Sequence, residues 1–149
     1  MTRRWILSIL LLISQGFGSA IKQMPYRLLK SSLPKESDQF KEAAFVVSVD
    51  RTLNEHEITT LLCEILAKEK PSDYQRLTID VYVDLDEYIP ALGSPILERK
   101  LKEHHLANYV WARDIRGHGR RLAVTRDSHG RPLNHWHFYD YDHTNDCRQ

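Results

Sequence analysis

One amphipathic helix between two strand-like runs constrains this chain more than any other feature. Asn54 suits a helix N-cap, and Glu57, three residues later, completes a capping box. Leu53 and Ile58 occupy the staple positions on either side of that cap. The apolar residues that follow recur at helical spacing, namely Ile58, Leu61, Leu62, Ile65 and Leu66. A helix with one apolar stripe buries it against another element, so we expect the stripe to form core.

The runs on both sides of this helix predict strands. Residues 43–50, AAFVVSVD, are apolar and β-branched, which suits a central strand covered on both faces. Residues 76–85 alternate strictly between two faces. The face that we expect to be core carries Leu77, Ile79, Val81, Val83 and Leu85. The face that we expect to be wet carries Thr78, Asp80, Tyr82 and Asp84.

The rest of the chain predicts more strands than helices. Residues 96–106 suit a short helix, and residues 108–127 suggest a hairpin with its turn at RGHGR. Residues 133–141 can add a last strand. We therefore expect an α+β fold, in which one long helix packs on one face of a small, mostly antiparallel sheet. Residues 43–127 form the predicted core domain, and residues 128–149 a C-terminal extension or added strand.

The first 20 residues read as an export signal. Arg3 and Arg4 precede a short apolar run, residues 5–13, and Gly18 and Ala20 suit the −3 and −1 positions of a peptidase site. A run of nine residues is too short to span a bilayer core, which needs roughly 20. We expect cleavage after Ala20, no membrane span afterwards, and a periplasmic or secreted protein. Residues 21–42, with Pro25 and Pro34, read as a tether.

The net charge of the mature chain bears on its partner, and its two cysteines bear on whether it contains a disulfide. Loss of Arg3 and Arg4 leaves 19 basic and 20 acidic residues, so the mature chain is near neutral and nucleic acid is not an expected partner. Cys63 and Cys147 are the two cysteines, and an oxidising compartment favours a disulfide between them. Cys147 lies near the end of the chain, where residues fray, so two unpaired thiols stay an alternative.

Four pieces of the chain resemble a group of short, uncharacterised bacterial exported proteins and lipoproteins. The matching pieces are residues 47–51 around "SVD", the capped helix 53–66, the strand 79–85, and the "W-A" strand with its return, 111–124. They cover about half of the mature chain. The resemblance implies no activity, because the group has none established, and residues 128–149 depart from its pattern.

Histidines near the C-terminus are the candidate metal ligands. In NHWHFYDYDH, a strand would place His135 and His137 on one face and Trp136 and Phe138 on the other. His-x-His can present two imidazoles to one zinc ion, and His118 or His129 from the hairpin would supply a third. The alternative is a strand or tail whose aromatic residues pack while its histidines face water.

Arginines form the candidate binding surface. Between residues 113 and 131 lie six arginines, two acids and no lysine. Arginine binds carboxylate and phosphate bidentately, so the cluster suits an anionic polymer or an acidic protein. Tyr109 and Trp111 share a strand face with Arg113 and can add a stacking platform. The cluster comprises Arg113, Arg116, Arg120, Arg121, Arg126 and Arg131. The alternative is a solvated hairpin whose charges prevent edge aggregation.

Acidic residues gather at the end of the predicted strand 77–85: Asp80, Asp84, Asp86 and Glu87. They can bind a cation, pair with the arginines, or form a solvated face.

The leading hypothesis is a small exported domain that binds an anionic polymer or an envelope protein without catalysis and without a cofactor. One alternative is a zinc hydrolase using His135 and His137, and another is a structural envelope protein.

Overall fold

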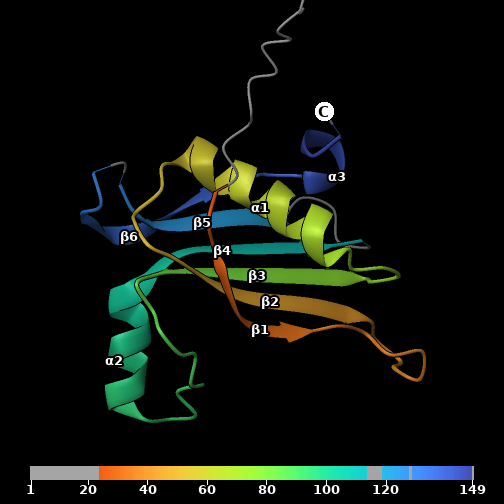
Figure 1. Cartoon of the computed structure of the whole chain (residues 1–149), viewed down its shortest axis with the longest axis horizontal. Coiled ribbons are helices and arrows are strands. Elements are labelled where there is room, and N and C mark those ends of the chain that lie inside the picture. Colours follow the sequence, from red (N-terminus) through yellow and green to blue (C-terminus); the bar gives the residue numbers. More distant parts are fainter. Residues whose placement is uncertain (1–23, 114–118, 128, 149) are drawn as a thin grey trace, which may run out of the picture.

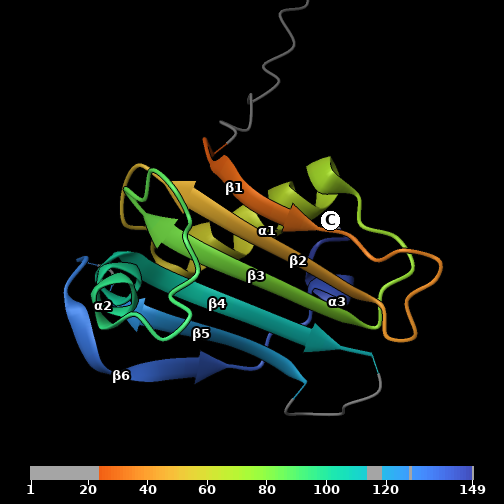
Figure 2. The same ribbon diagram turned by 90° about the horizontal axis from the view of Figure 1, so that it is seen from below.

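Six strands form one continuous sheet in a computed structural model, which describes residues 24–113, 119–127 and 129–148. The predicted export signal lies outside these described residues. The strands lie side by side in chain order, as Figure 2 shows. They are β1 (Arg27–Ser32), β2 (Glu42–Val49), β3 (Arg76–Val83), β4 (His105–Ala112), β5 (Arg120–Arg126) and β6 (Pro132–Tyr139).

The helix α1 (Glu55–Glu69) determines the one parallel pairing of the sheet. It carries the chain from the end of β2 back to the start of β3, so these two strands run in the same direction. The other four strand pairs are antiparallel. The predicted capping box is confirmed: Asn54 accepts from the backbone N–H of Glu57, and the Glu57 carboxylate accepts from the backbone N–H of Asn54.

The predicted fold class is wrong. We expected one long helix on a small, mostly antiparallel sheet, whereas the molecule is dominated by a six-stranded mixed sheet. Its helices are short: α1 has 15 residues, α2 (Pro95–His104) has 10 and α3 (His143–Asp146) has 4. The prediction overweighted α1 because a capped, amphipathic helix gives a strong local signal, while exposed strands give a weak one.

Strand β1 shows why the sheet was underestimated. It lies within the segment expected to be a tether, yet it pairs antiparallel with β2 along its length. Five of its six residues are exposed, so its sequence shows no apolar alternation. Backbone hydrogen bonds to β2, which leave no trace in side-chain pattern, hold this edge strand in the sheet.

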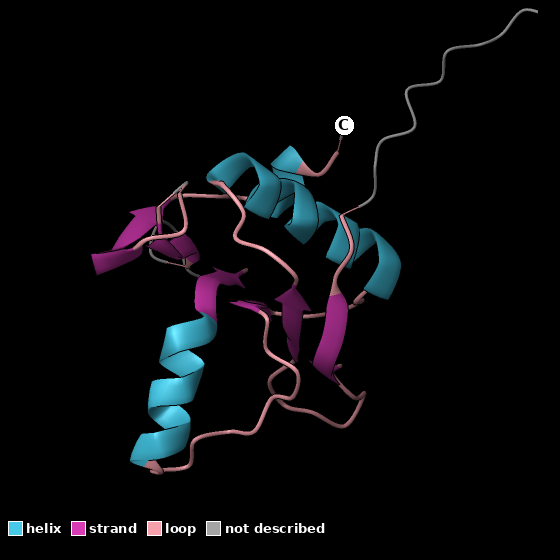
Figure 3. Cartoon of the chain, turned by 60° about the vertical axis from the view of Figure 1, so that its left-hand side comes forward, coloured by secondary structure: helices cyan, strands magenta, loops and turns pink. Residues whose placement is uncertain are grey.

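The two faces of the sheet differ in what covers them. Helix α1 lies across one face, and α2 projects from the opposite one (Figures 1 and 3). Between α1 and the sheet lies the main core, to which the helix contributes the buried Ile58, Leu61, Leu62 and Ile65. We call the opposite side the open face; its own smaller cluster of buried residues is Val46, Tyr82 and Leu85.

This smaller cluster corrects the prediction that one face of β3 is wet. Tyr82 is buried, because Tyr88 and Leu101 pack against its cluster on the open face. Leu85 also lies there, although the alternation placed it with the core residues of β3. The chain reverses its alternation at Asp84, whose φ of 50° is the left-handed conformation that Asp tolerates.

The C-terminal segment belongs to the fold. The predicted hairpin is confirmed by the antiparallel pairing of β4 with β5, and β6 then pairs with β5. After β6 the chain crosses to the α1 side of the sheet, where Tyr141 and His143 are buried. The described part of this segment, residues 129–148, therefore supplies an added strand and part of the core.

Candidate functional site

The predicted arginine cluster does not form one surface among the described residues. Arg120 and Arg121 are consecutive in β5, so they lie on opposite faces of the sheet. On the α1 side, Arg120 donates to Asp142 at 2.9 Å and lies 3.7 Å from Asp140. On the open face, the Arg121 guanidinium lies 4.7 Å from the ring centroid of Phe138.

The remaining arginines are mostly engaged within the molecule. Arg126 donates to the backbone carbonyls of Glu103 and Gly130, and Arg131 bonds the Asp127 carboxylate at 2.8 Å. Arg113 is exposed just after β4, and Arg116 lies outside the described residues. Among the described arginines of this cluster, Arg113, Arg121 and Arg131 are exposed, although the guanidinium of Arg131 is paired with Asp127.

The predicted stacking platform lies inside the protein. Tyr109 is fully buried in the main core, and its hydroxyl bonds His143. Trp111 is half-buried on the same side, with its ring edge-on to the rings of Tyr74 and His143. These two rings therefore serve packing, and a ligand at the surface does not reach the face of Tyr109.

The predicted metal ligands are brought together only in part. The exposed rings of His135 and His137 stack with their centroids 4.9 Å apart. His129 lies in the turn before β6, and His118 lies outside the described residues. Within the part of the chain that the structure describes, no group of three or more His, Cys, Asp or Glu side chains is placed to hold a metal ion.

The predicted acidic group is dispersed. Asp80 lies on the open face, whereas Asp84, Asp86 and Glu87 are exposed in the loop after β3. Asp86 pairs with Arg27 at 3.2 Å, so one of these acids is tied to β1 instead of the arginine cluster.

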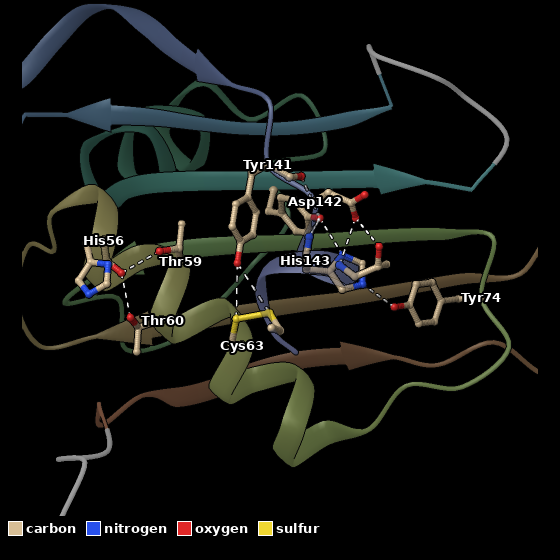
Figure 4. The surroundings of a disulfide bond; sticks show 11 residues. His56, Thr59, Thr60, Cys63, Tyr74, Tyr141, Asp142 and His143 are labelled. Atoms are coloured by element: carbon tan, nitrogen blue, oxygen red, sulfur yellow. Dashed lines mark hydrogen bonds between the residues drawn. A yellow bond between two sulfur atoms is a disulfide. The ribbon is translucent and has the colours of Figure 1, made fainter. Parts of the chain in front are cut away.

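A disulfide and a buried histidine join the C-terminal segment to the core (Figure 4). Cys63 of α1 is bonded to Cys147, and the hydroxyl of Tyr141 lies 3.5 Å from the Cys63 sulfur. Nearby, Nε2 of His143 bonds the Tyr74 hydroxyl at 2.8 Å, and Nδ1 bonds the Tyr109 hydroxyl at 2.7 Å. Both nitrogens are satisfied, so His143 acts as a structural residue.

Burial governs ionisation around His143. Burial lowers the pKa of His143, although the neighbouring Asp142 carboxylate opposes that shift. Burial also raises the pKa of Tyr109, and it raises the pKa of Tyr141 to about 12. The histidine is therefore held neutral between two un-ionised phenols at neutral pH.

The open face carries a groove of about 970 Å³ between α2 and β6. Residues 98–103 of α2 form one wall, and residues 132–136 at β6 contribute to the other. Its floor comes from β3, β4 and β5: Asp80, Tyr82, His105, Thr125 and Arg126. A concave site of this size falls in the range of small-molecule and oligomer sites, roughly 300–1,000 Å³.

A row of rings follows the groove. The His105 ring is edge-on to Tyr82 at 5.3 Å and stacked against Trp136 at 5.2 Å between centroids. Phe138 extends the row beyond Trp136, with centroids 6.3 Å apart. Trp136 keeps 46% of its surface exposed, so one side of its ring stays open while His105 supports the other.

Hydrogen bonds and one close polar contact hold the floor of the groove and the end of α2 in place. Asp80 accepts from the Asn108 amide at 2.7 Å, and the same oxygen, Oδ1, lies 3.7 Å from Nε2 of His105. The end of α2 is tied to the sheet because His104 bonds the Val83 carbonyl and Arg126 bonds the Glu103 carbonyl. Helix α2 has no buried residue, so these bonds help to hold it as a wall.

Sequence reasoning missed most of this groove. It placed Trp136 opposite the histidine pair but assigned it no role, and it gave none to His105 or to α2. The adjacent pair His104 and His105, at the junction of a predicted helix and strand, is the available signal. The contact of Trp136 with His105 joins residues 31 apart and depends on the sheet order, which sequence periodicity does not supply.

Comparisons with known proteins found no match to the chain among protein-family models, curated proteins or solved structures. The resemblance to short exported proteins therefore stays a prediction. Among the described residues, every helix is too short or too polar to cross a bilayer.

Proposed function

We propose that the protein is an exported, non-catalytic binding module that holds its ligand in the groove between α2 and β6. The observation that carries this proposal is the exposed Trp136 ring, stacked on His105 at the groove wall. A flat ring supported from behind and open in front is a preformed contact surface, and such surfaces bind with little loss of conformational freedom.

The charges of the groove favour a ligand without large net charge. Its lining includes three acids, Asp80, Glu98 and Glu103, and three permanent bases, Arg99, Lys102 and Arg126. Of the six arginines that suggested a polyanion, those that the structure describes do not share one face, and several are bonded within the chain. We therefore place the binding site in the groove and not on the arginine hairpin.

A panel of probes tests the proposal by isothermal titration calorimetry: neutral hexasaccharides, heparin, an acidic peptide and a proline-rich peptide. The wild-type protein is compared with Trp136→Ala, which removes the exposed ring. The matched control is Phe40→Ala, because Phe40 is 56% exposed and does not line the groove. We expect one probe class to bind, with an affinity at least about tenfold weaker in Trp136→Ala and unchanged in the control. No binding by any class, or equal binding by all three proteins, would overturn the proposal.

Export is the second part of the proposal. It is supported by the arginines and apolar run of residues 3–13, and the disulfide between Cys63 and Cys147 suits an oxidising compartment. Expression of the full sequence in a bacterium, followed by fractionation and N-terminal sequencing, tests it. We expect protein outside the cytoplasm that begins at Ile21. Cytoplasmic protein that retains residues 1–20 would contradict export.

A further inference from the structure

The groove has a chemistry that selects among ligands. Trp136 offers one open ring face beside several ionised and polar groups, an arrangement in which apolar and hydrogen-bonding surfaces are adjacent. A ligand that fits must therefore present a flat apolar patch and, around its edge, groups that both donate and accept hydrogen bonds. Pyranose sugars have this form, because the C–H bonds of one ring face are apolar and the hydroxyls project from the rim.

Hydrogen-bonding groups of both kinds are available around Trp136. Both contacts to Asp80 end on Oδ1, so Oδ2 is left to accept from a ligand hydroxyl. Lys102 and Arg99 of the α2 wall can donate, and Glu98 can accept. A hydroxyl serves either partner, whereas the attraction of a phosphate or carboxylate to the three bases of the groove would be offset by repulsion from its three acids.

Within the described part of the chain, two nitrogen atoms in the groove floor lack a hydrogen-bond partner, which also favours a ligand rich in hydroxyls. Nδ1 of His105 and Nε of Arg126 are shielded from water and have no hydrogen-bond partner among the described residues. His105 is also 91% buried, and it lies directly beneath Trp136. Buried polar atoms without partners are costly, by about 1–3 kcal/mol each. A hydroxyl-rich ligand that enters the groove beside Trp136, with the ring still stacked on His105, brings hydrogen-bonding groups next to these atoms.

Peptide ligands fit this groove less well. Addition of a strand needs a free sheet edge, but the floor strands β3, β4 and β5 each have neighbours on both sides. A proline-rich peptide suits an aromatic groove, yet proline has no N–H and would offer few donors to Glu98 and to the second oxygen of Asp80. A neutral sugar chain provides both the stacking face and the donors.

We propose that the groove binds a neutral oligosaccharide, with one pyranose ring stacked on Trp136 and a hydroxyl of the sugar donating to Asp80. This inference rests on the proposed function, since it names the ligand class of the same groove. It requires that the affinity depend on both residues and change little with salt, because the ligand carries no charge.

The probes are cellohexaose, maltohexaose and chitohexaose, titrated into wild type, Trp136→Phe, Trp136→Ala and Asp80→Asn. We expect at least one hexasaccharide to bind, in the order wild type, Trp136→Phe, Trp136→Ala, the last weaker by at least about tenfold. Asp80→Asn should weaken it by about three- to tenfold, because the amide is a poorer acceptor. The control Asp86→Asn, which changes an exposed carboxylate in the loop after β3 that does not line the groove, should bind as wild type does.

Salt and competing ligands separate the outcomes. Raising NaCl from about 0.05 to about 0.5 M should change the hexasaccharide affinity by less than about twofold. Binding of the proline-rich peptide or of heparin alone, with loss in Trp136→Ala, would keep the binding module and overturn the sugar as its ligand. Hexasaccharide binding that ignores both Trp136 and Asp80 would overturn this site. Thermal unfolding of each variant verifies that it is folded.

Discussion

His143 shows how one residue can connect distant parts of the chain. Its ring lies between the hydroxyls of Tyr74, which precedes β3, and Tyr109, which lies in β4. The Tyr109 hydroxyl also lies 3.3 Å from the Tyr141 carbonyl oxygen and accepts from the backbone N–H of His143. The imidazole is thus held in position by two phenols.

Replacement of His143 by Phe should destabilise the protein by about 2–4 kcal/mol. The ring volume is retained, but the half-buried Tyr74 hydroxyl loses its imidazole partner, at about 1–3 kcal/mol, and the Tyr109 hydroxyl loses one of its bonds, at about 0.5–1.5 kcal/mol. Urea unfolding at pH 7.5 measures the loss. The matched control is His137→Phe at an exposed position, where we expect a change within about 0.5 kcal/mol. Equal effects at the two positions would contradict the role of the buried network.

The pH dependence of stability should report the same residue. Because burial lowers the pKa of His143 in the folded state, the unfolded chain, with a pKa near 6.5, binds the proton more readily. The stability due to neutral His143 is complete above that value and is lost as pH falls through the lower folded pKa. Between pH 7 and 5 we expect stability to fall more steeply in wild type than in His143→Gln. The difference should stay below about 1.4 kcal/mol per pH unit, the limit for one proton. Parallel curves would contradict it.

Sequence reasoning at this scale succeeded where a residue acts through its neighbours in the chain. Asn54 and Glu57 are three residues apart, and their capping box could be predicted. His143 and Tyr109 are 34 residues apart, and the pattern of NHWHFYDYDH treated His143 as one more histidine on a strand face. Buried polar pairs of this kind depend on the packing of separate elements, which local spacing does not encode.

At the scale of elements, a disulfide links helix α1 to the much shorter helix α3. Helix α3 has four residues, too few to be stable alone, yet its C-cap Cys147 is bonded to Cys63 in the middle of α1. The disulfide closes a loop of 84 residues that includes every strand from β3 to β6. It thereby constrains the unfolded chain over most of the domain.

Removal of this disulfide, by replacing Cys63 and Cys147 with Ser, should cost about 4–5 kcal/mol in the chain-entropy model. The midpoint of denaturation in guanidinium chloride measures the loss. The control is wild type in a reducing buffer, which should approach the stability of the double variant. If the variant and the oxidised protein unfold at the same midpoint, the disulfide contributes nothing to stability.

The start of α1 offers a smaller and independent test. Asn54→Ala removes the side chain that accepts from Glu57, and we expect a loss of about 1 kcal/mol. Asn54→Asp retains an acceptor there and should come within about 0.5 kcal/mol of wild type. Urea unfolding compares the two variants. A loss as large in Asn54→Asp would contradict the capping role.

For the whole molecule, the sequence did not allow us to predict which strands lie side by side in the sheet. Each of β2, β3, β4 and β5 was predicted from its own residues, but the pairing of β2 with β3 in parallel was not. The exposed edge strands were the hardest to read, since β1 and most of β6 bury few side chains. Periodicity alone could therefore not predict the groove, because its walls depend on where β6 lies in the sheet and on how α2 projects from it.

Truncation after Asp127 tests how far the C-terminal segment is integral. It removes β6, the buried Tyr141 and His143, and one partner of the disulfide, so we expect loss of the cooperative unfolding transition. Circular dichroism during heating measures this. A control that lacks only residues 148 and 149 should unfold like wild type. A cooperative transition in the truncated chain would show that residues 43–127 fold alone.

The separation of 84 residues between the two cysteines also determines when the disulfide can form during synthesis. Chains grow at about 5–20 residues per second, so Cys63 exists for roughly 4–17 s before Cys147 has been made. Throughout that interval its thiol has no native partner and is open to mixed disulfides with other molecules. Because Cys147 follows all six strands in the chain, the correct bond becomes available only once the complete sheet has been synthesised. Oxidative closure is thus a late event, and a cell that makes this protein has to keep Cys63 unreacted until then.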